Sequence, residues 1–208
     1  MKEDRLFTSK LIKSQLIDFL MLDSTNDLLI GSEVMYGTKR KLVDLLVLNN
    51  NQLTAIEIKA DNDDLRRIQE QIEESKKTFD YIIVCTTTAH LEKTKQLLGN
   101  DIGIYCFNEK GIDKIRKPKK QKKLDKTEIL YSISANFLKK DLPTSASKIN
   151  SDEVRKQYIK KSADKIHTIF VDYVQRKFQS KYELFLLSRG KYTLIDDIPL
   201  LSSSAYIQ

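Results

Sequence analysis

Three charged side chains interrupt two otherwise apolar segments, and their types suit hydrolysis of a phosphodiester. Asp44 lies within LVDLLVL, and Glu57 and Lys59 lie within LTAIEIK. Charged side chains are rarely buried unless they are paired or bind a metal ion. Two carboxylates, with the Ile58 carbonyl as a third oxygen, suit a hard cation such as Mg²⁺ or Mn²⁺. Lys59 would then orient the attacking water or stabilise the transition state, so the set predicts a metal-dependent hydrolytic site.

The segment that carries these residues predicts a β-hairpin. Residues 43–48 and 53–59 are rich in β-forming side chains, and the NNN between them is a turn signal. Side chains alternate along a strand, so Glu57 and Lys59 share one face, and antiparallel pairing can bring Asp44 across from the Glu57 region. An alternative is a cross-strand ion pair between Asp44 and Lys59 on a solvated face.

The pattern of Asp44 followed by Glu57-Ile58-Lys59 resembles the D…(D/E)xK signature of the PD-(D/E)xK, or restriction-endonuclease-like, nuclease superfamily. The wider stretch EVMYGTKRKLVDLLVLNNNQLTAIEIKADNDDLRRIQEQ resembles more narrowly the small bacterial family called sce7726, over roughly residues 25–90. This resemblance implies that Asp44 and Glu57 bind the metal ion and that Lys59 is the catalytic lysine.

The same resemblance implies two helper residues. Glu33 matches an upstream acid that serves as a further metal ligand or water contact, and Gln71 matches a helix glutamine near the site. The chain departs from the pattern at Ser75, where many relatives have tyrosine, and at Val43, where the nominal residue is proline. A surface role for Glu33 and an ordinary helical role for Gln71 remain alternatives.

The rest of the first half predicts helices that alternate with buried strands. We expect helices over residues 4–20, 64–79 and 90–98, and strands over 81–87 and 102–107. The expected class is α/β: a restriction-endonuclease-like core of order α-β-β-β-α-β, with a mixed sheet flanked by helices and a mostly helical C-terminal extension.

Charge divides the chain unevenly. Residues 1–109 contain 14 Lys/Arg and 18 Asp/Glu, whereas residues 110–208 contain 22 and 11, giving net charges of −4 and +11. We expect a nuclease-like domain over residues 1–110, a basic linker over 111–126 and a helical basic region over 127–208. Within that region, one helix is expected over 127–140 and a longer one from Ser151 to about residue 180 or beyond.

Two basic clusters predict contacts with nucleic-acid phosphates, although a solvated turn and a solvated linker are the alternatives. The clusters are Lys39, Arg40 and Lys41, and Lys117, Lys119, Lys120, Lys122 and Lys123. Aromatic residues in the second half can stack on single-stranded bases, but core packing or a helix interface is favoured for them. They are Tyr158, Phe170, Tyr173, Phe178, Tyr182 and Phe185.

Other features exclude several classes of protein. There is no run of 18 apolar residues, and the charged start MKEDRLFTSK lacks an apolar signal region, so we expect a cytoplasmic protein without a membrane partner. Cys85 and Cys106 lie in apolar runs and are expected as reduced core cysteines. His90 and His167 lie far apart and show no metal-ligand pattern.

Together these features predict a Mg²⁺- or Mn²⁺-dependent endonuclease acting on DNA, with RNA as an open alternative. A second hypothesis is a catalytically inactive module of the same fold that binds DNA or assembles through its helical region. A third is a helical interaction protein whose basic tail meets acidic partners. Two cuts in a duplex need two active sites, so a homodimer through the C-terminal helices is also open.

Overall fold

A six-stranded sheet forms the centre of the protein, for which the computed structural model describes residues 7–24, 27–140 and 149–202. The strands lie side by side in chain order. The pairs β1–β2, β2–β3 and β5–β6 are antiparallel, and the pairs β3–β4 and β4–β5 are parallel. The strands are β1 (Leu29–Tyr36), β2 (Lys41–Asn49), β3 (Gln52–Lys59), β4 (Tyr81–Thr87), β5 (Gly103–Asn108) and β6 (Gly111–Arg116). The α/β class with a mixed sheet is confirmed.

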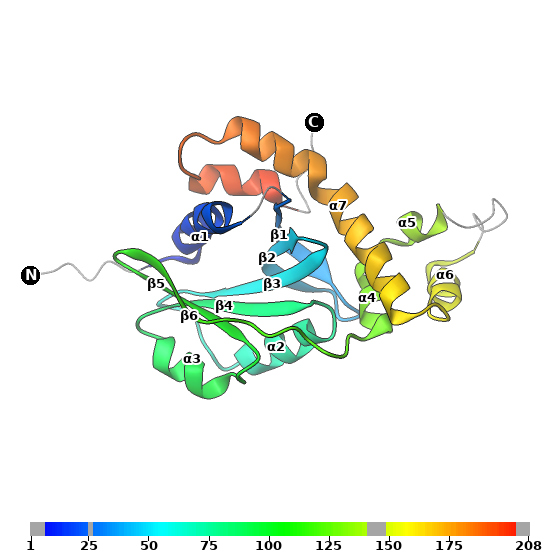
Figure 1. Cartoon of the computed structure of the whole chain (residues 1–208), viewed down its shortest axis with the longest axis horizontal. Coiled ribbons are helices and arrows are strands. Elements are labelled where there is room, and N and C mark those ends of the chain that lie inside the picture. Colours follow the sequence, from blue (N-terminus) through cyan, green and yellow to red (C-terminus); the bar gives the residue numbers. More distant parts are fainter. Residues whose placement is uncertain (1–6, 25–26, 141–148, 203–208) are drawn as a thin grey trace, which may run out of the picture.

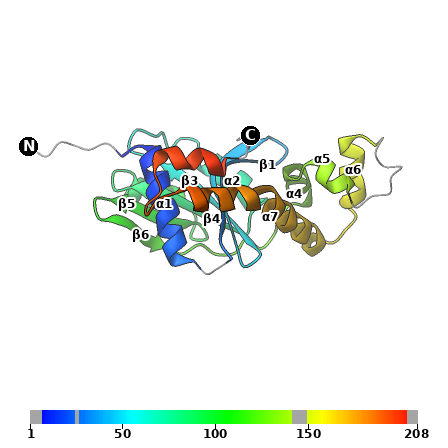
Figure 2. The ribbon, with the colours of Figure 1, turned by 90° about the horizontal axis from the view of Figure 1, so that it is seen from above.

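Helices flank both faces of this sheet (Figure 1). They are α1 (Ser9–Asp23), α2 (Ile68–Lys76), α3 (Leu91–Leu97), α4 (Lys126–Ser132), α5 (Ala135–Lys139), α6 (Ser151–Tyr158), α7 (Ala163–Ser188) and the 3-10 helix η2 (Ile195–Leu201). Helices α2 and α3 lie below the sheet in Figure 1, and α1, η2 and the end of α7 lie above it. Figure 2 shows α4, α5 and α6 gathered at one end.

The predicted β2–β3 hairpin is confirmed, and its turn follows from local chemistry. Asn50 and Asn51 have φ angles of 50° and 59°, which asparagine tolerates better than most residues. The strand expected over 102–107 is confirmed as β5, but it is not the last strand. Residues 111–116, expected as the start of a linker, form β6, because Gly111 with φ 121° allows a tight turn directly after β5.

The two helices predicted after residue 126 are each broken in two. The helix expected over 127–140 stops at Ser132, and the Ser134 side chain accepts a hydrogen bond from Phe137 N to start α5. The helix expected from Ser151 stops at Tyr158, and Ser162 caps the start of α7 in the same way. A serine side chain can accept a hydrogen bond from a backbone N–H group of the first turn of a helix. Ser134 and Ser162 therefore favour the start of a new helix over the continuation of the preceding one.

Helix α2 begins four residues later than the sequence predicted. The aspartates before it bond elsewhere: Asp61 Oδ2 accepts a hydrogen bond from Phe7 N, and Asp63 Oδ2 accepts one from Ala60 N, each at 2.8 Å. Residues 60–64 therefore tie the end of β3 to the segment before α1. Helix α1 starts at Ser9, after the Thr8 cap, and ends three residues beyond the expected range of 4–20, of which residues 4–6 lie outside the described residues. Helix α3 lies within the range expected for it.

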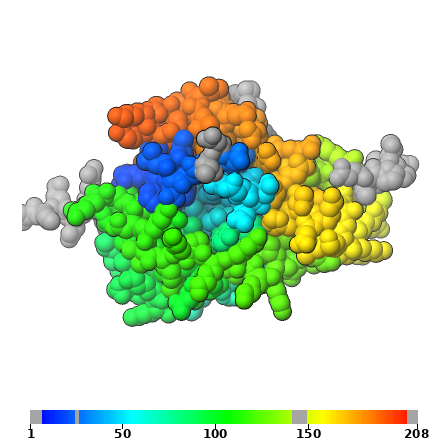
Figure 3. Space-filling model, viewed as in Figure 1, coloured from blue at the N-terminus to red at the C-terminus, as the bar shows by residue number. Residues whose placement is uncertain are grey.

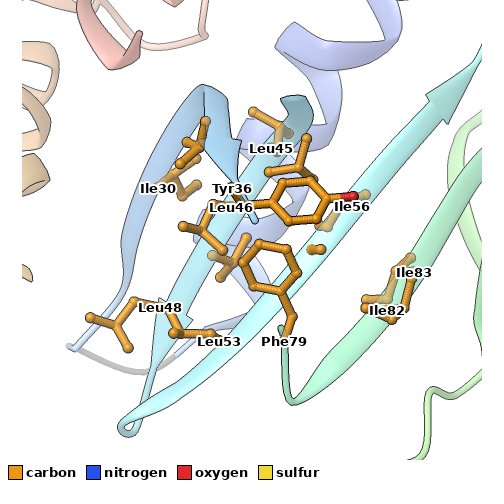
Figure 4. Packing of buried hydrophobic residues seen from close by; sticks show 14 of the residues in the cluster. Ile30, Tyr36, Leu45, Leu46, Leu48, Leu53, Ile56, Phe79, Ile82 and Ile83 are labelled. Atoms are coloured by element: carbon orange, nitrogen blue, oxygen red, sulfur yellow. The ribbon is translucent and has the colours of Figure 1, made fainter. Parts of the chain in front are cut away.

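One continuous apolar core joins the sheet to the C-terminal helices. Figure 4 shows its centre, where Tyr36 and Phe79 pack edge to face among the aliphatic side chains of β1 to β4. Helix α7 approaches β1 so closely that a Cβ atom on Gly31 would lie 2.9 Å from Phe178 Cε1. All the second-half aromatics singled out in the sequence are buried except Tyr173, which packs on Phe137. The core interpretation of these aromatics is confirmed.

Asp80 is a buried junction between the sheet and α7. Its side chain is 2% exposed, and its Oδ2 accepts hydrogen bonds from Leu53 N and His167 Nε2, each at 2.8 Å. Burial alone would raise the pKa of Asp80, but the hydrogen bonds from His167 and Leu53 outweigh it and lower the pKa below 3.8. His167 thus has a structural partner that its sequence context did not indicate.

The remaining expectations concern cysteines and membranes. Cys85 and Cys106 are free and buried, as predicted. Within the described part of the chain, no helix combines the length and the apolar character needed to cross a membrane.

We predict that Asp80→Asn lowers the free energy of unfolding at pH 7 by roughly 1–3 kcal/mol, because it weakens hydrogen bonds to a buried carboxylate. Since the folded pKa is lowered, this contribution is present above pH 3.8 and is lost as the pH falls through the acid range. Urea denaturation at pH 7 measures the first effect, and a series of measurements at descending pH values below 3.8 measures the second. The exposed Asp196→Asn serves as a control, and equal stability of the two variants at pH 7 would contradict the prediction.

Candidate active site

The hairpin brings Asp44 to the backbone between Glu57 and Lys59. The β2–β3 ladder runs through Leu45 and Ile56, and Ile58 N donates a hydrogen bond to Asp44 Oδ2 at 2.8 Å. Glu57 and Lys59 lie one residue either side of that amide and share a strand face. Asp44, Glu57 and Lys59 therefore lie together, although Lys59 pairs with Gln71 rather than with Asp44 as the ion-pair alternative required.

Glu33 lies opposite Asp44 where the β1–β2 ladder is interrupted. The ladder pairs Ser32 with Leu45 and Val34 with Val43, but it skips the pair between them. Glu33 has a φ angle of 51°, a left-handed conformation that costs a non-glycine residue on the order of 1 kcal/mol. Such strain is concentrated at functional sites, and here it places the Glu33 carboxylate next to the hairpin acids.

Lys13 of α1 belongs to the same cluster, and the sequence analysis missed it. Its Nζ bonds to Glu33 Oε1, lies 3.5 Å from Ser32 Oγ and lies 3.9 Å from Asp44 Oδ1. Its side chain is only 9% exposed. A signal was present, since Lys13 occupies the same helical stripe as the buried Ile17 and Leu20.

Glu57 is the most deeply buried acid of the cluster. The residue is 2% exposed, and its Oε1 has no hydrogen-bond partner among the described residues. Burial, reinforced by the charge of Asp44, raises the pKa of Glu57 from 4.5 to about 8, and the nearby Lys59 opposes this rise. A buried carboxylate oxygen without a donor is costly unless a proton or a cation compensates it.

The pKa of Asp44 is also set by opposing effects of burial and of nearby charges. Burial raises its pKa, whereas the hydrogen bond from Ile58 N and the charge of Lys13 lower it, and the net direction is upward. Glu33 adds to the rise because its negative charge repels that of Asp44. Burial and the negative charges of the neighbouring carboxylates therefore raise the pKa of both Asp44 and Glu57, and the charges of Lys13 and Lys59 oppose this rise only in part.

Gln71 of α2 positions Lys59, with 2.9 Å between Lys59 Nζ and Gln71 Oε1. Four residues further on, Ser75 Oγ lies 2.9 Å from Tyr36 OH, and burial raises the pKa of that phenol to about 12. Gln71 and Tyr36 also line a hollow of about 420 Å³, whose other walls include Lys41 and Arg67. Glu70, which pairs with Lys41, also lines this hollow, so the hollow adjoins Gln71, the partner of Lys59, and carries side chains of both signs.

A larger hollow, of about 520 Å³, lies at the other end of the hairpin. Its lining includes Asn50, Asn51, Gln175 and Gln179, with Asp27 as its ionisable side chain. Asp44 lies near the start of β2, whereas this hollow lies at the turn beyond the end of β2. The larger hollow therefore does not contain the Asp44, Glu57 and Lys59 cluster.

The two predicted nucleic-acid clusters lie in different places. In the turn before β2, Lys39 pairs with Glu74 at 2.8 Å and Lys41 with Glu70 at 2.6 Å, both on α2. Arg40 Nε lies 3.2 Å from Met35 Sδ. This turn is close to the hollow beside Gln71, so it adjoins the candidate site, and its two lysines are partly neutralised by acids.

The second cluster lies at the opposite end of β4 from the site. Gln121 N donates to Asp80 O just before β4 begins, whereas Lys59 pairs with Thr86 near the end of β4. The residues of this cluster, Lys117, Lys119, Lys120, Lys122 and Lys123, are exposed. Lys120 also lies 3.8 Å from Asp80 Oδ1.

The carboxylates of the cluster suit a hard divalent cation, but they are not arranged as a complete set of ligands for one. Carboxylate oxygens are the ligands that Mg²⁺ and Mn²⁺ prefer, and the unpartnered Glu57 Oε1 beside Asp44 is available to such an ion. Among the described residues, however, no group of three or more His, Cys, Asp or Glu side chains is arranged to hold a metal ion. Two carboxylates fit the ion, and the third, Glu33, is bonded to Lys13.

We predict that Glu57→Gln removes a pH dependence from the stability of the protein without added metal. Because the folded pKa is raised, the folded state holds a proton that the unfolded state releases between pH 4.5 and about 8. Stability therefore falls as the pH rises through that window, by at most about 1.4 kcal/mol per pH unit. The advantage of Glu57→Gln over wild type should grow from pH 5 to pH 8 in urea denaturation. Glu92→Gln, on exposed α3, is the control, and a constant difference would refute the burial argument.

Comparison with known proteins places the chain in a family. The family model described as Bacteriophage P4 protein cII matches residues 2–202. No curated protein matches the sequence. A solved structure described as an SPO1766 protein of unknown function from Silicibacter pomeroyi is similar at 12% identity, with a TM-score of 0.45, over 89% of this chain and 97% of that one.

The family match corrects the assignment made from the hairpin motif. The resemblance to the sce7726 family of the PD-(D/E)xK superfamily rested on roughly residues 25–90, whereas the matching family model covers nearly the whole chain. A short acidic motif in a hairpin is a weak family marker, because many hairpins can carry it. The chain belongs to the Bacteriophage P4 protein cII family.

Proposed function

We propose that this protein is a metal-dependent nuclease that hydrolyses phosphodiester bonds of DNA at the Asp44, Glu57 and Lys59 cluster. The observation that carries the proposal is the buried Glu57 oxygen without a hydrogen-bond partner among the described residues, next to a second carboxylate. The proposal includes the finer fold prediction, that α1 to β4 are arranged like the core of the restriction endonucleases. The order of three antiparallel strands, a helix and a parallel strand supports that arrangement.

Each side chain has a role that its contacts support. Asp44 and Glu57 would hold Mg²⁺ or Mn²⁺, with Glu33 and the Ile58 carbonyl as further oxygen ligands. A bound ion of this kind supplies a lowered pKa for water and charge stabilisation at the phosphate. The Ile58 N–H fixes one oxygen of Asp44 and leaves the other directed to the cluster.

Lys59 is the group proposed to meet the reacting phosphate. Gln71 holds its ammonium through one hydrogen bond, which leaves further N–H donors for a phosphoryl oxygen or a water molecule. A fixed cation at the place where negative charge develops lowers the barrier more than a mobile one. Gln71 is therefore a positioning residue in this proposal.

Charge supports a polyanionic substrate. The second half of the chain carries a net charge of +11, and Lys41 and Arg67 line the hollow beside Gln71. We favour DNA as the substrate and keep RNA as the alternative, since phosphate contacts do not distinguish the two. A homodimer through the C-terminal helices, which would supply two sites for two strands, stays a prediction.

One observation favours a second candidate, a nucleic-acid-binding module of the same fold without catalysis. The Lys13 ammonium already compensates Glu33 and approaches Asp44, so the cluster has an internal cation before any metal ion arrives. A protein of this kind would bind DNA in a salt-dependent way and show no metal-dependent cleavage.

We predict that wild-type protein cleaves DNA in Mg²⁺ or Mn²⁺ and that Asp44→Asn and Lys59→Ala each lower the rate by roughly 10²-fold or more. Gln71→Ala should cost less, about tenfold, because Lys59 keeps its charge and loses only its orientation. Linear, nicked, single-stranded and supercoiled DNA, with an RNA arm, are incubated with each variant.

Lys93→Ala, on the exposed side of α3, is the matched control for Lys59→Ala and should cleave like wild type. Equal rates for wild type, Asp44→Asn and Lys59→Ala would rule out the assigned site. Salt-sensitive DNA binding without any metal-dependent cleavage would select the non-catalytic module instead.

We also predict that the basic segment distant from the site contributes affinity rather than chemistry. Replacing Lys119, Lys122 and Lys123 together by alanine should weaken DNA binding and flatten its salt dependence. The slope of log K against log salt should become shallower by about 0.9 for each phosphate that these lysines neutralise in the wild type. Fluorescence anisotropy over a range of salt concentrations measures this, and an unchanged slope would identify the segment as solvated surface.

A further inference from the structure

Lys13 is a buried amine that lies against both upstream carboxylates of the cluster. The polar contacts of its Nζ are Glu33 Oε1, Ser32 Oγ at 3.5 Å and Asp44 Oδ1 at 3.9 Å. Helix α1 supplies it, and it shares the buried face of that helix with Ile17 and Leu20. On the face seen in Figure 3, α1 (blue) is bordered by the β5–β6 segment in green and by the orange part of the C-terminal helices.

The position of this amine matters because it lies where a metal ion shared by the same two acids would lie. A divalent ion binding Glu33 and Asp44 needs oxygen atoms from both within about 2.0–2.6 Å. Lys13 Nζ already bonds to one of these carboxylates and approaches the other. The two cations would repel one another strongly at contact distance in a partly buried site.

A divalent ion can reach the carboxylates from a different side than the Lys13 ammonium, so one cation can replace the other. The side chains of Glu33 and Asp44 are 45% and 30% exposed, so an ion can reach them from solvent, whereas Lys13 is held from the protein side. The buried Glu57 Oε1, without a hydrogen-bond partner among the described residues, belongs to an acid that feels the charge of Asp44, and it would be available to such an ion.

We propose that the Lys13 ammonium is a built-in counter-cation that competes with the divalent ion, and this inference rests on the proposed function. Lys13 must leave Glu33 before the ion can bind. The cluster then has two states, one held by lysine and one held by metal. In the first state the three acids are partly compensated and the fold is maintained without an ion. In the second state the Lys13 ammonium is released from Glu33.

Metal affinity, measured apart from cleavage, tests this proposal. Mn²⁺ binding is followed by electron paramagnetic resonance or calorimetry for wild type, Lys13→Met, Asp44→Asn and the double variant Lys13→Met/Asp44→Asn. Lys10→Met, an exposed lysine three residues earlier on α1, is the matched control. We expect Lys13→Met to bind Mn²⁺ at least about tenfold more tightly than wild type, because the competing charge is gone. Lys10→Met should bind like wild type, and the double variant should not show the tighter binding.

The outcomes separate this inference from the function on which it rests. If Asp44→Asn abolishes Mn²⁺ binding but Lys13→Met binds no more tightly than wild type, the metal site stands and the competition is refuted. If Asp44→Asn binds like wild type, or if no variant binds, the metal site itself is refuted and the competition with it.

A second measurement avoids the risk that Lys13→Met folds poorly. Nuclear magnetic resonance of ¹³C-labelled lysine side chains follows the Lys13 Cε signal, identified by its loss in the conservative variant Lys13→Arg. Adding Mg²⁺ should shift this signal toward that of solvent-exposed lysines and leave the Lys10 signal in place. A Lys13 signal that does not move while Mg²⁺ saturates the site would overturn the proposal.

Discussion

Burial of the Glu57 carboxylate beside Asp44 is the constraint on which the site depends. Two acids in a shared low-polarity environment repel each other, and burial raises the pKa of both. The fold compensates only in part, through the Ile58 amide, Lys13 and Lys59, and one oxygen of Glu57 has no hydrogen-bond partner among the described residues. A protein keeps such an arrangement against its cost where it serves binding or chemistry, which is why the cluster is the centre of the functional proposal.

The surrounding architecture explains how these groups meet. The asparagine turn fixes the β2–β3 register, the β1–β2 ladder is interrupted at Glu33 opposite Asp44, and α1 and α2 supply Lys13 and Gln71 from separate parts of the chain. Helix α7 covers β1 and is tied to the sheet through Asp80 and His167, so the C-terminal helices stabilise the strands that bear the site. The basic segment near Asp80 is at the far end of β4, so the proposed binding of a polyanion and the proposed chemistry involve different parts of the surface.

Sequence patterns predicted the elements whose signals are local. The β2–β3 hairpin, the buried strand β4 and the core role of the α7 aromatics followed from alternation, turn residues and apolar spacing. The helix breaks at Ser134 and Ser162, and strand β6, were not predicted, because serine and glycine occur both inside and at the ends of such segments, and their local signal is weaker than the surrounding helical or basic pattern. Lys13 was missed although it lies on the same helical stripe as Ile17 and Leu20, because that stripe does not show that the amine meets Glu33 of β1. The family assignment failed because a short motif was used to identify a whole chain.

The most direct test of the central claim is anomalous diffraction at the manganese edge from crystals grown or soaked with Mn²⁺. If Asp44 and Glu57 hold the metal ion, a peak lies within about 2.0–2.6 Å of carboxylate oxygens of both residues. Mn²⁺ bound only elsewhere on the protein, with Asp44 and Glu57 in well-defined density and no peak between them, would contradict it.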